Sequence, residues 1–178
     1  MKKLLLLFAL AISNVVNAQI FNVKFGDEYN VANPAVTILI GMPSKETKST
    51  VKIEQVFKNV TVYGSKFKIA EIQYTGTGKD GKLYLDNAFF SNEFYLYSDA
   101  VSFIDKISKV LLNKFGEHKI QSVPEGYSFW VNYGKSPSFD GNEPLCSLSM
   151  QRIDGVYYVL LNFGPFYMAH WLEQQKNK

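Results

Sequence analysis

The stretch SDAVSFIDKISKVLLNKFG, residues 98–116, decides the fold, because it is the longest run of the chain with helical periodicity. One side of the helix expected here is polar and holds two lysines, an aspartate and an asparagine. Ser98 or Asp99 can cap its first turn, and Gly116 can end it. At 100° per residue the apolar side chains fall on one arc, which predicts a sheet beneath the helix: Ala100, Phe103, Ile104, Ile107, Val110, Leu111 and Phe115.

The rest of the chain consists mainly of short runs with β-type alternation. Residues 27–40 are ambiguous because Asn33-Pro34 interrupts any helix there, and a short helix is expected at 167–175. Strands come in hairpin-connected groups, so the pattern predicts an α+β fold, an antiparallel β-sheet with helices packed on one face. The expected strands are 20–25, 51–62, 67–74, 83–86, 94–97, 126–133, 145–153 and 156–163.

Residues 1–18 have the features of a secretory signal peptide. Lys2 and Lys3 precede an apolar run that is too short to span a bilayer, and Val16-Asn17-Ala18 is a cleavage site before Gln19. We therefore expect a periplasmic or secreted protein with a single α+β domain at 19–178 and no stable membrane insertion after cleavage. The alternative is an uncleaved membrane anchor. A lipoprotein signal is not expected, since no cysteine follows the cleavage point.

Composition excludes several classes of function. Cleavage of the signal peptide would remove Lys2 and Lys3, so the formal net charge would fall from +3 to +1. The remaining chain holds one arginine, Arg152, and no basic cluster, so nucleic acid is not an expected partner. With one cysteine there is no intrachain disulfide, and the core must stabilise the domain. No cofactor is expected either.

Four segments occur in the order VKFGDEY, NVTVYGSKFKIAEIQY, GKLYLDNAFF and SDAVSFIDKISKVLLNKFG, between residues 23 and 116. This layout resembles small secreted or envelope proteins of Bacteroidetes-type bacteria whose fold is likened to β-lactamase inhibitory protein (BLIP). Such BLIP-like proteins build a helical element followed by antiparallel strands, sometimes twice. The resemblance implies a binding or envelope role outside the cytoplasm and carries over no catalytic residue. The chain departs from the pattern at Pro34, and a second copy after Gly116 is not evident.

Candidate catalytic residues are few. The run GTGKDGKL, residues 76–83, matches part of a phosphate-binding loop, but Leu83 replaces the Mg²⁺-binding hydroxyl and a strand follows, which favours a hairpin loop. Cys146 invites a nucleophile role with His118 or His170 as base, yet it alternates with Leu148 on a strand, as a core cysteine does. A secreted hydrolase with an unrecognised active site is therefore the alternative function.

Metal sites have equally little support. His118 and His170 lack a second ligand at zinc spacing. The run FDGNEP, residues 139–144, offers three oxygen donors but not a complete calcium loop. We expect no metal.

Aromatic residues are in surplus and suggest a binding surface. In the strand at 126–133, Trp130 stands between polar residues, whereas Tyr127, Phe129 and Val131 share the other parity. We expect Trp130, Tyr133 and Phe139 to form a partly exposed contact patch for a protein or carbohydrate partner. The alternative is that Trp130 packs in the core against the helix at 98–116. The sequence therefore predicts an exported, non-enzymatic binding protein.

Overall fold

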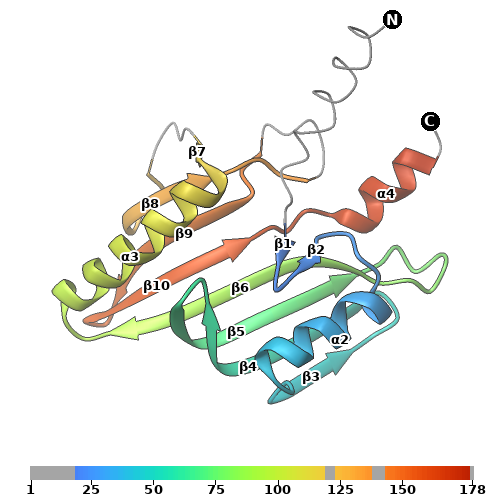
Figure 1. Cartoon of the computed structure of the whole chain (residues 1–178), viewed down its shortest axis with the longest axis horizontal. Helices are drawn as coiled ribbons and strands as arrows, with labels where there is room; N and C mark the ends of the chain where they lie inside the picture. The colour runs from blue at the N-terminus through green and yellow to red at the C-terminus, as the bar shows by residue number, and fades with distance from the viewer. Residues whose placement is uncertain (1–18, 119–122, 138–142, 177–178) are drawn as a thin grey trace, which may run out of the picture.

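The computed structural model describes residues 19–118, 123–137 and 143–176, and its centre is one eight-stranded antiparallel sheet (Figure 1). The strand order is β3-β4-β5-β6-β10-β9-β8-β7. A separate hairpin is formed by β1 (Gln19–Ile20) and β2 (Val23–Lys24). The predicted α+β fold with an antiparallel sheet is confirmed. The strands of the main sheet are β3 (Lys45–Lys48), β4 (Lys52–Val62), β5 (Ser65–Thr75), β6 (Tyr84–Phe94), β7 (Glu117–His118), β8 (Tyr127–Tyr133), β9 (Cys146–Ile153) and β10 (Val156–Phe163).

One layout, a helix followed by four antiparallel strands, occurs twice in the described chain. Helix α2 (Tyr29–Ile40) precedes β3 to β6, and helix α3 (Tyr97–Phe115) precedes β7 to β10. The two last strands, β6 and β10, pair with each other at the middle of the sheet. The strand order is consequently a palindrome of the two units, with β3 and β7 at the outer edges.

Both long helices lie on the same face of the sheet, in front of the strands in Figure 1. Phe103 of α3 meets Phe67 and Phe94 at ring-centroid distances of 5.3 and 5.1 Å. Tyr29 of α2 meets Tyr74 at 4.9 Å. The apolar arc of α3 faces the sheet as predicted, with Ala100, Ile104, Ile107 and Leu111 buried. We call this side of the sheet the helix-covered face.

Helix α2 corrects the expectation that Pro34 interrupts helical structure at 27–40, because Pro34 lies inside a continuous twelve-residue helix. Proline removes the N–H that would bond to the carbonyl of Asn30. Pro34 and Asn30 are both exposed, so the ring meets solvent and water can satisfy the freed carbonyl. The buried positions Ala32 and Val36 hold the helix on the sheet.

The strand expected at 83–86 and the one expected at 94–97 are also corrected. A single strand, β6, runs from Tyr84 to Phe94 and contains most of the first and only the first residue of the second. Tyr97, the last residue of the second expected strand, begins α3. Strands β3 and β7 were not expected. The loop at 76–83 joins the antiparallel strands β5 and β6, which is the predicted hairpin arrangement.

The C-terminal helix α4 (Met168–Lys176) is held beside β6 by a buried carboxylate. Asp86 is 2% exposed and accepts a hydrogen bond from the backbone N–H of Met168 at 2.7 Å. Asp86 is the extra residue at an irregularity where β6 opposes Gln73 and Tyr74 of β5. The Met168 side chain packs so closely on Gly26 that a Cβ there would come within 2.6 Å of its methyl carbon.

Candidate functional site

The candidate site is the second face of the sheet, which we call the open face. The ring contacts described above between α2 or α3 and the sheet all involve the helix-covered face, and both of these helices lie on that side. Strand register defines four rows of side chains on the open face: Trp130, Ser149, Leu160, Ser91 and Ile69; Asn132, Ser147, Asn162, Phe89, Glu71 and Val56; Tyr127, Gln151, Tyr158 and Glu93; and Asn87, Gln73, Glu54 and Thr47.

Trp130 and Tyr127 form the aromatic end of the open face. Their rings meet edge to face, with centroids 4.9 Å apart and planes at 83°. The indole N–H of Trp130 donates to Oδ1 of Asn132 at 3.1 Å, which fixes the ring along the strand. A register shift between Tyr127 and Phe129 places Tyr127 opposite Gln151, on the same side as Trp130. This corrects the expectation that Tyr127 shares the parity of Phe129 and Val131.

The structure separates the three residues of the predicted patch. Trp130 is partly exposed, as predicted, and the alternative that it packs in the core is wrong, since Phe129 and Val131 are the residues of this strand that pack there. Tyr133 is only 3% exposed and its hydroxyl donates to Ser108 of α3 at 3.0 Å. It is therefore not a surface contact, and burial raises the pKa of its phenol. Phe139 lies outside the described residues.

The burial of Tyr133 could have been predicted from sequence, because regular alternation along β8 gives it the same parity as Phe129 and Val131. Tyr127 and Tyr158 were missed as site residues for different reasons. Tyr127 is displaced by the irregularity in β8, and β10 is apolar on both parities, so its faces cannot be assigned from sequence. Strand pairing settles the point, because Tyr158 lies opposite Gln151 and Glu93 on the open face.

Hydroxyl and amide groups lie between the large side chains. Ser149 is next to Trp130 on one side and Leu160 on the other, and is 3% exposed. Ser147 lies between Asn132 and Asn162 in the next row. The open face thus combines rings and aliphatic groups with hydrogen-bonding groups that change little in charge with pH.

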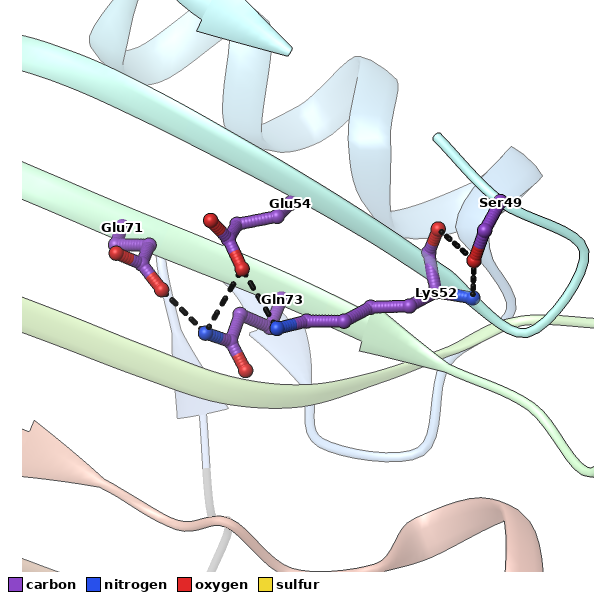
Figure 2. A network of polar contacts seen from close by, with 5 residues as sticks. All are labelled: Ser49, Lys52, Glu54, Glu71 and Gln73. Atoms are coloured by element: carbon purple, nitrogen blue, oxygen red, sulfur yellow. Dashed lines mark hydrogen bonds and ion pairs between the residues drawn. The ribbon is translucent and has the colours of Figure 1, made fainter. Parts of the chain in front are cut away.

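The opposite end of the open face is a polar network on β4 and β5, which Figure 2 shows on the side of the strands away from α2. The amide of Gln73 donates to Glu71 and, at 3.5 Å, to Glu54. Lys52 forms an ion pair with Glu54 at 2.6 Å. Farther along, Lys68 pairs with Glu93 at 2.9 Å. These partly exposed ion pairs contribute little to stability, but they hold the carboxylates in defined positions.

The proposed catalytic pairing of Cys146 with a histidine is not formed. Cys146 is buried on the helix-covered face, opposite Tyr133 and Phe163, and desolvation raises the pKa of its thiol. His118 pairs with Asn132, so its side chain belongs to the open face on the other side of the sheet. His170 is exposed on α4. A thiol so placed does not provide a nucleophile.

The described residues contain no group of three His, Cys, Asp or Glu side chains that could hold a metal ion. Of the predicted oxygen donors at 139–144, Asp140 and Asn142 lie outside the described residues, and Glu143 is exposed. Nor is any helix in the described part of the chain long and apolar enough to cross a membrane.

A role for this protein is inferred from the geometry of the open face. No protein-family model, curated protein or solved structure matches the chain.

Proposed function

We propose that the protein is a non-enzymatic binding module that binds a protein partner through the open face of its sheet. The observation that carries this proposal is the partly exposed aromatic pair Trp130 and Tyr127, beside serine and amide side chains, on a face that α2 and α3 leave uncovered. Aromatic side chains of this kind provide large, rigid contact areas, and Ser and Asn provide adaptable hydrogen bonds.

A protein partner fits the size of this face. Six strands about 4.8 Å apart, with four rows about 7 Å apart, give an area on the order of 800 Å². A standard protein interface buries about 800 Å² on each partner. A carbohydrate ring stacks on the flat side of one aromatic ring, whereas Trp130 meets Tyr127 edge to face and its N–H is already bonded to Asn132. These features favour a protein over a glycan.

The compartment belongs to the same proposal. Residues 1–18, which carry the signal-peptide pattern, lie outside the described residues, so export rests on sequence. The doubled layout of one helix and four antiparallel strands supports the proposed resemblance to BLIP-like envelope proteins. We therefore place the partner in the periplasm or outside the cell. The hydrolase alternative gains no support from Cys146 and His118, because their side chains lie on opposite faces of the sheet.

Site-specific photocrosslinking tests this function. A benzophenone amino acid replaces Tyr158 on the open face or, as a control, Leu112 on the outer side of α3, and the native host expresses each variant. Mass spectrometry identifies adducts that form only at position 158. The identified protein is then purified and titrated calorimetrically against wild type, Trp130→Ala and Leu112→Ala.

We expect Trp130→Ala to weaken the affinity by tenfold or more at an unchanged melting temperature, and Leu112→Ala to bind as wild type. Equal adducts at both positions, or a Trp130→Ala variant with wild-type affinity, would contradict the proposal. Binding to a glycan array that Trp130→Ala abolishes, without a protein adduct, would instead assign a carbohydrate ligand.

A further inference from the structure

Helix α2 presents an apolar stripe to solvent, on the side of the molecule opposite the open face. Ile38 is 81% exposed, Met42 79% and Val31 65%. Val31 and Ile38 are seven residues apart and so lie on one narrow arc of the helix, with Leu39, at 51% exposure, beside it. Met42 follows Gly41, the residue at which the helix ends. Patches of several large exposed apolar side chains in soluble proteins usually mark an interaction surface.

The fold does not require this stripe. Helix α3 has the same place in the second unit of the doubled layout, yet its outer side carries Asp105, Lys106 and Lys109, all exposed. Helix α2 contains no charged residue. Since a charged outer side is compatible with this position, the apolar outer side of α2 is a property of this helix and not of its packing on the sheet.

We propose that α2 binds α2 of a second copy of this chain, antiparallel and across a two-fold axis. The first argument is charge. An uncharged stripe meets its own copy without burying a charged side chain. The carboxylates that flank α2 already have partners, since Glu28 pairs with Lys82, and Glu46 pairs with Lys48 at 2.8 Å. A bilayer surface is disfavoured, because interfacial helices carry Lys or Arg beside their apolar face and α2 has none.

The second argument is the helix dipole. Helix α2 has no acidic residue in its first turn, no basic residue in its last turn and no side-chain cap at Glu28. The partial positive charge at the N-terminus of α2 and the partial negative charge at its C-terminus are therefore not compensated by side chains within the helix. An antiparallel second α2 brings the positive end of one helix beside the negative end of the other. Two-fold pairing of identical patches is also the commonest symmetry of soluble homo-oligomers.

The area of the stripe sets the strength of this association. Three large side chains of α2, each more than half exposed, form a patch on the order of 300 Å² on each copy. The total is below the roughly 1,600 Å² of a standard interface. We therefore expect a weak dimer that forms at micromolar or higher concentration and dissociates on dilution.

Analytical ultracentrifugation over a concentration series, on the protein in the form that the host produces, tests this inference. The mass of the wild type should rise from one copy toward two. Ile38→Glu should stay at one copy, and the control Leu112→Glu, a 50% exposed leucine on α3, should associate as wild type. Circular dichroism verifies folding. Should Ile38→Glu fail to fold, Val31→Ser, which introduces a smaller and uncharged side chain, replaces it.

Three results would overturn the inference. They are a wild type that stays at one copy up to millimolar concentration, an Ile38→Glu variant that associates as wild type, and equal loss in Ile38→Glu and Leu112→Glu. Flotation of the wild type with phosphatidylcholine vesicles, without self-association, would assign the stripe to a lipid surface instead. None of these measurements depends on the open face, so this inference and the proposed function fail independently.

Discussion

The carboxylate of Asp86 in β6 accepts the backbone N–H of Met168, which lies 82 positions later in the sequence. Burial raises the pKa of Asp86 above its ordinary 3.8, although hydrogen bonds from Met168, Thr75 and Tyr167 oppose this shift. The folded state therefore holds the Asp86 proton more tightly than the unfolded state does. The contribution of Asp86 to stability is fully present below pH 3.8 and is lost as the pH rises through its folded-state pKa.

We therefore predict that Asp86→Asn gains in free energy of unfolding, relative to wild type, as the pH rises from below 3.8 to neutral. The asparagine oxygen can still accept the Met168 N–H but carries no buried charge. Urea unfolding of both proteins across this range gives the difference at each pH. A difference that is constant, or that decreases with rising pH, would show that the pKa of Asp86 is not raised.

Two adjacent leucines of β10 distinguish the faces of the sheet. Leu161 is fully buried on the helix-covered face, whereas Leu160 is only partly buried on the open face. Leu161→Ala should lower the free energy of unfolding by about 2–5 kcal/mol, because it leaves a cavity in the core. Leu160→Ala should cost less than half as much, since water already reaches this side chain. Chemical denaturation measures both, and equal losses would mean that the open face is covered in solution.

Pro34 gives a prediction on helix α2. Pro34→Ala should restore the missing N–H to the helix and raise the free energy of unfolding by about 1–2 kcal/mol, with part of the gain offset by a more flexible unfolded chain. Thermal melting followed by circular dichroism measures the change. A lower melting temperature would indicate that the proline ring contributes a contact of its own.

The Cys146 thiol should be unreactive in the folded protein. Burial raises its pKa, so almost no thiolate is present at neutral pH and reagent cannot reach the sulfur. We expect labelling by an aromatic disulfide reagent only at denaturant concentrations that unfold the chain. Rapid stoichiometric labelling in native buffer would contradict this placement.

Export remains a prediction from sequence. Mass spectrometry of the protein recovered from the host should find Gln19 as the first residue. An intact Met1 on a cytosolic product would refute the signal peptide and, with it, the extracytoplasmic partner.

The parts of the fold that could be predicted are those with one clear periodicity. Helix α3 has an apolar arc, a polar arc and Gly116 after its last residue, so its existence and its C-terminal end follow from sequence. Its N-terminal end does not, because the helix begins at Tyr97 and its N-cap is Leu96, without a side-chain cap from Ser98 or Asp99. Helix α2 is apolar on both sides and contains Pro34, so periodicity gives no signal. Asparagine is depleted in strands, so Asn87 and Asn92 weaken the strand pattern of β6. The strand is nevertheless continuous, because it pairs with β5 on one side and β10 on the other.

An irregularity of strand pairing explains the error at Tyr127, and β5 also departs from regular alternation. Buried positions on β5 change parity between Phe67 and Ala70, and Ile69 is exposed although it is two residues from Phe67. A separate register shift between β5 and β6 lies between Gln73 and Tyr74. Such shifts depend on the neighbouring strand, which sequence alone does not identify.

Because α2 and the open face lie on opposite sides of one sheet, any contact made through α2 leaves the open face accessible. Two copies joined at α2 would therefore carry two open faces directed away from each other. If two partner molecules are held at a matching distance, binding of one partner to the first open face raises the effective concentration of the second partner at the other open face. Avidity of this kind can exceed single-site affinity by about 10²–10⁴ without any new contact.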